Sequence, residues 1–192
     1  LGLAAAVTIK ARIALQEIWK DKNIGWDDPL PVESQLAWVK LFDEIENLKT
    51  VQFPRCLQPQ DSFGLPELHV FADASMLAYG AVAYLVWSRA DGIKVRLISA
   101  KARVAPICQT TIPRLELMGT LLASRLAKTV NDEFKIKPSK VILWSDSMIV
   151  LAWLLSESTS FRLFVGVGVA EIQTTWESST WRYVPTDENP AD

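Results

Sequence analysis

The sequence is short of the residues that hold small secreted folds together. It has 192 residues but only two cysteines, Cys56 and Cys108, and a single histidine, His69. Two cysteines make neither a disulfide framework nor a zinc site, so we expect an intracellular, reducing setting. No apolar run approaches the ~20 residues of a membrane span, and the apolar start lacks the basic leader of a signal peptide. Because no Met precedes Leu1, we expect a fragment of a longer protein.

A strong charge of one sign is also lacking, since the net charge is −2. The charges are unevenly placed, however, because residues 89–140 contain 11 Lys and Arg against 4 Asp and Glu. Such asymmetry is typical of a face that contacts phosphates, and it equally fits a solvated surface that happens to be basic. Hydrophobic residues make up 49% of the chain and include eight Trp. That is ample for a buried core, so we expect a folded globular protein.

The pattern along the chain predicts two regions. Residues 1–62 have apolar positions at helical spacing, over about 7–19 and 33–48, and a connection rich in Pro and Gln follows over 54–66. Residues 63–192 alternate between strand and helix patterns. Strands are predicted at 67–73, 79–88, 93–100, 141–146 and 181–184, and helices at 113–131, 147–156 and 161–176. Gly166 and Gly168 weaken the prediction of the last helix.

This order of elements predicts an α/β fold. The first three strands, joined by short turns, should form an antiparallel meander. The later strand–helix–strand connections should add parallel neighbours, because such crossovers place their strands side by side in one direction. The expected architecture is therefore a mixed five-stranded sheet with flanking helices, preceded by a small helical segment.

Acidic residues end two of the predicted strands. Asp73 and Asp146 would emerge at the same edge of the sheet if their strands are parallel neighbours, and ligands bind at that edge in open α/β sheets. Glu116 lies in the first turns of the intervening helix, where a face of small residues would let the helix approach the sheet. That face is formed by Gly119, Thr120, Ala123 and Ala127. Three converging carboxylates repel one another, and divalent cations reverse that cost.

Each carboxylate also has an ordinary structural interpretation. Asp73 could be a turn or cap residue at a strand end, and Asp146 could cap the following helix. Glu116 near a helix start is favoured by the helix dipole. Taken singly, these interpretations compete with a metal site. Taken together and in this order, the three residues favour a site for metal ions that activate water on a phosphodiester.

Four short motifs give the sequence a family resemblance. They are Phe-Ala-Asp-Ala-Ser (71–75), Pro-Arg-Leu-Glu-Leu (113–117), Trp-Ser-Asp-Ser (144–147) and Glu-Asn-Pro-Ala-Asp (188–192). In this order they resemble the acidic motifs of retroelement ribonuclease H domains, most closely those of BEL/Pao-type LTR retrotransposons. The first region is similar to the thumb or connection segment between the reverse-transcriptase palm and its ribonuclease H domain. The resemblance implies a ribonuclease H-like domain over 63–192, truncated at its C-terminal helix.

The resemblance implies a function as well. It implies an endonuclease that cleaves the RNA strand of RNA–DNA hybrids with two Mg²⁺ or Mn²⁺ ions. Its partners would be the hybrid and the rest of the Pol polyprotein, in a cytoplasmic virus-like particle or in the nucleus, and no membrane. The implied metal ligands and catalytic residues are Asp73, Glu116, Asp146 and Asp192. The expected nucleic-acid-binding residues are Lys101, Arg103, Arg114, Ser75 and Ser147.

The sequence departs from the family pattern in several places. Many ribonucleases H have a His before the last acidic residue, whereas 183–188 has none, and His69 is expected to be a packed residue of the first strand. Residues 164–170 (FVGVGVA) are richer in Gly and Val than the polar helix of the family. Asp192 rests on the resemblance alone and, as the terminal residue, is expected to be mobile. No Tyr-x-Asp-Asp signature is present, so we expect no DNA polymerisation.

Three other functions remain open at this point. A retrotransposon aspartic peptidase would need Asp-Thr-Gly or Asp-Ser-Gly, which the sequence lacks. A catalytically silent structural or nucleic-acid-binding module of reverse transcriptase is favoured by the truncation and the missing His, while the intact acidic set argues against it. A related polynucleotidyl transferase, such as an integrase core, is disfavoured by the N-terminal resemblance.

Overall fold

The computed structural model describes residues 2–108 and 110–192, so Leu1, where the predicted N-terminal region begins, and Gln109 lie outside the described residues. Two N-terminal helices precede a sheet with three further helices. In chain order the elements are α1 (Ala5–Lys20), α2 (Val32–Asn47), β1 (Ser62–Ala74), β2 (Ala78–Arg89), β3 (Gly92–Val104), α3 (Ile112–Glu133), β4 (Lys140–Ser145), α4 (Met148–Leu154), α5 (Leu163–Thr175) and β5 (Trp181–Tyr183). Within this part of the chain, no helix is both long enough and apolar enough to cross a membrane.

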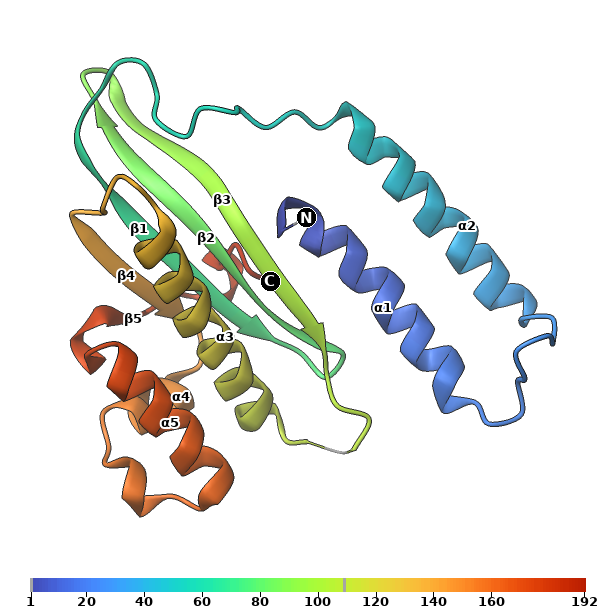
Figure 1. Ribbon diagram of the computed structural model, residues 1–192. Helices are drawn as coiled ribbons and strands as arrows, with labels where there is room; N and C mark the ends of the chain where they lie inside the picture. The colour runs from blue at the N-terminus through green and yellow to red at the C-terminus, as the bar shows by residue number, and fades with distance from the viewer. Residues whose placement is uncertain (1, 109) are drawn as a thin grey trace.

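The five strands form one mixed sheet in the order β3-β2-β1-β4-β5. β1, β2 and β3 make an antiparallel meander, and β4 pairs in parallel with both β1 and β5. The predicted meander and the predicted mixed sheet are therefore confirmed. Because β1 and β4 are parallel neighbours, their carboxyl ends lie at the same edge of the sheet (Figure 1). Asp73 lies near the end of β1, and Asp146 directly follows β4.

Helix α3 lies across the centre of the sheet, in contact with β1 and β2 (Figure 1). Its small residues face the sheet as predicted, since Thr120, Ala123 and Ala127 are fully buried. At Gly119 the approach is closest, because a Cβ there would lie 2.7 Å from the carbonyl oxygen of Asp73. The larger Leu117 points elsewhere, against Gly168 of α5. The small-residue face thus brings α3, and Glu116 with it, onto the end of β1.

The first strand is longer than the sequence pattern predicted. β1 begins at Ser62, so residues 62–66 of the predicted connection are part of the strand. The predicted boundary between the two regions, after residue 62, therefore falls inside the first residues of β1. The pairing with β2 shifts register between Phe63 and Glu67, and Gly64 has a φ of +71°. This irregularity accommodates Pro66, which cannot donate to a regular ladder. The strand β3 likewise extends to Val104, past the predicted end at 100.

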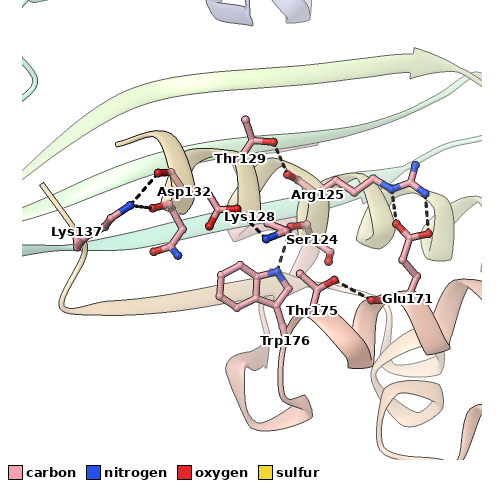
Figure 2. Close-up of polar contacts among 10 residues, drawn as sticks. Ser124, Arg125, Lys128, Thr129, Asp132, Lys137, Glu171, Thr175 and Trp176 are labelled. Atoms are coloured by element: carbon pink, nitrogen blue, oxygen red, sulfur yellow. Dashed lines mark hydrogen bonds and ion pairs between the residues drawn. The ribbon is translucent and has the colours of Figure 1, made fainter. Parts of the chain in front are cut away.

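The Gly-rich segment predicted with least support is a regular helix, α5. Tertiary contacts hold it in place. Gly166 passes close to the backbone of Ser158, where a Cβ would meet the carbonyl oxygen at 2.8 Å. On the side of α3, Arg125 forms a two-pronged ion pair with Glu171 at 2.6 and 2.7 Å, and the indole of Trp176 donates to the Ser124 carbonyl at 3.1 Å (Figure 2). Glycine here permits close packing and does not break the helix.

Helix α1 covers the free edge of β3 (Figure 1). The Gln16 amide donates to the Ala105 carbonyl just beyond the strand at 2.7 Å, and Arg12 donates to the Ala102 carbonyl at 3.4 Å. An open strand edge is a template for unwanted pairing, and a covering helix removes it. Helix α1 is therefore packed onto the sheet domain, and α2 packs against α1.

Candidate active site

Asp73 lies at the end of β1 and is the centre of the acidic site. Its pKa is raised above the usual value, first by burial and next by the charge of Asp146, with further contributions from Asp192 and Glu116. The amide of Ala74 opposes this shift by hydrogen bonding to the carboxylate. The other three acidic residues predicted from the sequence are thus close enough to influence the carboxylate of Asp73. Like charges brought together without a counter-ion are a cost that a cation would relieve.

Glu116 is held from the side by Ser147. The Ser147 hydroxyl donates to Oε2 of Glu116 at 2.6 Å and accepts from the amide of Val150 at 3.2 Å. Ser147 is therefore the N-cap of α4, and the alternative in which Asp146 capped that helix is wrong. One buried hydroxyl both caps α4 and orients Glu116. The expected contact of Ser147 with nucleic acid stays a prediction.

Asp146 directly follows β4 and is oriented by a residue that the sequence had not singled out. The hydroxyl of Thr186 donates to Oδ2 of Asp146 at 3.0 Å. Thr186 lies after β5, which runs parallel to β4, so the loops that follow both strands meet at the same sheet edge. Thr186 is 40 positions from Asp146 in the sequence, and no local pattern around Thr186 predicts its contact with Asp146.

Asn189 anchors the C-terminal segment and was also missed. It is 5% exposed, and its side-chain amide donates to the Ala72 carbonyl, next to Asp73, at 3.0 Å. Its Oδ1 accepts from the amide of Ala191, and its own carbonyl accepts from the amide of Asp192 at 3.1 Å. Asp192 is thereby tied to β1 by a buried side chain, whereas terminal mobility had been expected. The Glu-Asn-Pro-Ala-Asp motif contained the signal, because a conspicuous Asn stands three residues before the acidic one.

For the metal-dependent hydrolysis that the family resemblance implies, we expect Asn189→Ala to reduce activity by about 10- to 100-fold, the loss typical when a group that orients a metal ligand is removed. The reason is that the segment bearing Asp192 loses its hydrogen bond to the Ala72 carbonyl. Cleavage rates as a function of metal concentration would measure the effect. Glu188→Gln, in the same segment but exposed, is the control. Equal rates for the two variants would show that Asn189 does not position Asp192.

The donor set fits a hard divalent cation in chemical type. Carboxylate oxygens with room for water are the ligands that Mg²⁺ prefers, and Asp73, Glu116, Asp146 and Asp192 supply them. Across residues 2–108 and 110–192, no three His, Cys, Asp or Glu side chains lie close enough together to hold a metal ion. Oε2 of Glu116 and Oδ2 of Asp146 instead accept from hydroxyl groups. The carboxylates are gathered around Asp73 without being closed into a ligand cage.

The residues expected to bind nucleic acid have different surroundings. Lys101 lines a cavity of about 430 Å³ together with Asp73, Ser75 and Asp192, and Arg103 is exposed two residues farther along β3. The Ser75 hydroxyl accepts from the amides of Leu77 and Ala78 in the β1–β2 turn. The structure thus places Lys101 and Ser75 beside the acidic site.

Arg114 and His69 are each engaged by aromatic side chains. The guanidinium of Arg114 lies 5.3 Å from the ring centroid of Phe164 on α5. His69 stacks on Trp144, and its Nδ1 accepts from the indole nitrogen at 3.1 Å. Its Nε2 lies 3.2 Å from a carboxylate oxygen of Glu67. The expectation that His69 is a packed strand residue is confirmed.

Comparisons with solved structures return RNase H domains. The N-terminal RNase H domain of rv2228c from Mycobacterium tuberculosis has a TM-score of 0.47 and 16% identity, over 65% of this chain and 86% of that one. RNase H1 from Halobacterium salinarum has a TM-score of 0.38 and 16% identity, over 67% and 91%. A foamy viral protease-reverse transcriptase in complex with dsDNA has a TM-score of 0.46 and 11% identity, over 92% of this chain and 34% of that one.

The family comparison covers most of the chain. The search of curated proteins finds no match to this chain. The model of the Pao retrotransposon-like RNaseH-like domain, in contrast, matches residues 1–147, a range that contains α1, α2, the meander, α3, β4 and three of the four acidic residues. The match also includes α1, which packs onto the sheet, and α2, which packs against α1. The chain therefore belongs to the family of Pao retrotransposon-like RNaseH-like domains.

Proposed function

We propose that this domain is a metal-dependent endonuclease that cleaves the RNA strand of RNA–DNA hybrids during reverse transcription of a retrotransposon. The observation that carries the proposal is that Asp146, Asp192 and Glu116, from the end of β4, the C-terminal segment and α3, lie near enough to Asp73 at the end of β1 for their charges to raise its pKa. Family membership supports it. The rest of the Pol polyprotein, in a cytoplasmic virus-like particle or in the nucleus, is the proposed setting.

In this proposal Asp73, Glu116, Asp146 and Asp192 would hold two Mg²⁺ or Mn²⁺ ions. When bound, such ions supply an activated water and stabilise the leaving oxygen of a phosphodiester. The chain's own residues orient the ligands, as Ser147 does for Glu116 and Thr186 for Asp146. These hydroxyls limit the freedom of the carboxylates and so lower the cost of ordering them when cations enter.

A second function, a catalytically silent nucleic-acid-binding module, is favoured by one observation. In the described part of the chain the acidic groups do not form a cluster that is closed enough to hold a metal ion. A silent module would bind hybrid without cleaving it.

The test is cleavage of a labelled RNA–DNA hybrid by the full chain, with Mg²⁺, with Mn²⁺ and with EDTA. We expect cuts in the RNA strand alone, only with cations, and no cuts in duplex DNA. Asp146→Asn should lose the activity, while Asp43→Asn, at an exposed position on α2, should keep it. Binding of the hybrid without metal-dependent cuts would favour the silent module.

A further inference from the structure

Four cationic side chains stand on one face of the edge strand β3. This cationic row consists of Lys94, Arg96, Lys101 and Arg103. Their cross-strand partners on β2 are, in the same order, Trp87, Leu85, Ala81 and Tyr79. All four partners are buried in the core that α3 covers. Because cross-strand partners project from the same face of a sheet, the row shares the face on which α3 lies.

The row is open to solvent. Helix α3 packs on β1 and β2 and barely touches β3, so it leaves this part of the face uncovered. Lys94, Lys101 and Arg103 are exposed, and Arg96 is partly exposed. From Lys94 to Arg103 the row is about 30 Å long, at ~3.3 Å per residue. A surface of this length can contact several successive phosphates of a duplex.

The row is not neutralised by the protein. Elsewhere cations are paired, as Arg125 is with Glu171 at 2.6 Å and Lys128 with Asp132 at 2.8 Å. In the part of the chain that the structure describes, no carboxylate lies within 4.0 Å of a cation of the row. The buried Nε of Arg96 also has no hydrogen-bond partner there. Like charges on one strand face repel, so an anionic ligand would stabilise the row.

One end of the row lies toward the sheet edge that bears the acidic site, on the opposite face of the sheet from the side chain of Asp73. Asp73 pairs with Gly80, and Gly80 pairs with Ala102, which lies between Lys101 and Arg103. Two strand spacings, about 10 Å, therefore separate this end of the row from Asp73. Lys101 and Asp73 line the same cavity. From there the row runs down β3, away from the carboxylates.

We propose that the cationic row binds the phosphate backbone of the RNA–DNA hybrid and anchors the duplex along β3, to one side of the phosphodiester to be cut. The inference rests on the proposed function for its ligand. Lys and Arg contacts to phosphates supply affinity and register without reading sequence, which suits an enzyme that acts on any hybrid. Phosphate binding by the row gives a role to Lys94 and Arg96, which lie far from the carboxylates.

The test is binding of a labelled hybrid, in EDTA, by the full chain carrying Asp73→Asn. Adding K94Q and R96Q should weaken binding about tenfold or more at low salt, and should lower the slope of log K against log salt concentration by about 2, close to one per phosphate contact. Adding K22Q and K40Q, an equal change of charge on the N-terminal helical segment, should leave affinity and slope unchanged. Lys94→Gln alone, at an exposed position, should lower the slope by about 1 even if the change at Arg96 disturbs the fold.

Equal affinities and slopes for the row variants and the control would overturn this inference. The two proposals fail separately. If binding of the hybrid depends on the row but the wild-type chain does not cleave the hybrid, the proposed role of the row stands and the proposed nuclease activity is rejected. If the wild-type chain cleaves the hybrid but the row variants bind it as tightly as the control, the nuclease activity stands and the proposed role of the row is rejected.

Discussion

Asp73→Asn is expected to lower metal-dependent cleavage of a hybrid by at least about 100-fold, the loss typical when one charge-stabilising group of an active site is removed. Asp73 is the carboxylate on which the other three act, and it lies at the end of a central strand. An amide has the same shape but lacks the charge that a divalent cation requires. Initial rates with Mg²⁺ and with Mn²⁺ would measure the loss.

The same substitution should stabilise the metal-free protein. Burial and three neighbouring carboxylates raise the pKa of Asp73, so the fold disfavours its ionised form. A carboxyl with a raised folded pKa contributes stability that is present below its ordinary pKa and is lost as pH rises through the folded value. At neutral pH the wild type carries this penalty and the Asn variant does not. Each kcal/mol relieved would raise the melting temperature by about 2–4 °C in a domain of this size.

Thermal unfolding in EDTA, at neutral pH and near pH 4, would measure the difference. We expect the advantage of Asp73→Asn to shrink as pH falls, because the wild-type carboxyl becomes protonated. Asp187→Asn, which removes an equal charge from an exposed turn, should leave the melting temperature unchanged. A variant at Asp73 that is no more stable than this control would show that the carboxylates are not crowded. Full cleavage by Asp73→Asn would remove Asp73 from the set of metal ligands.

The order of elements could be predicted because each strand and helix carries its own periodic pattern. The parallel pairing of β1 and β4 followed from the crossover through α3, and it placed Asp73 and Asp146 at one edge. The start of β1 could not be predicted, because Gly64 and Pro66 are typical of a connection and only pairing with β2 makes the segment a strand. The helix α5 was uncertain for a similar reason, since contacts with distant residues outweigh the low helix propensity of glycine.

The candidate site divides in the same way. The four carboxylates have local signals, namely strand ends, a small-residue helix face and a terminal motif. The residues that hold them make contacts across the fold, as Thr186 does with Asp146 and Asn189 with Ala72. Such contacts depend on which loops meet at the edge of the sheet, and no spacing along the chain encodes that. The cover of α1 over the β3 edge is of this kind as well, since it joins residues about 90 positions apart.

Gly119→Ala tests whether the close approach of α3 to β1 builds the site. The added Cβ would lie 2.7 Å from the carbonyl oxygen of Asp73 and 3.3 Å from its carbonyl carbon, and backbone atoms in a central strand cannot move aside cheaply. Helix α3 must therefore shift away from β1. Overpacking of this kind costs about 1–3 kcal/mol, which corresponds to roughly 2–12 °C in melting temperature. The same shift moves Glu116 away from Asp73, so cleavage should fall together with stability.

Gly168→Ala is the matched control, because it brings the same gain in helix propensity of about 1 kcal/mol. Its Cβ would meet Cδ2 of Leu117 at 3.1 Å and Cγ at 3.4 Å, so this buried side chain has to give by only a few tenths of an ångström. We expect this variant to be as stable as the wild type or slightly more stable, with unchanged cleavage. The difference between the two variants therefore isolates the contact with the Asp73 backbone from helix propensity. Equal melting temperatures for both would mean that α3 has room to move, and that the small-residue face does not fix the distance between Glu116 and Asp73.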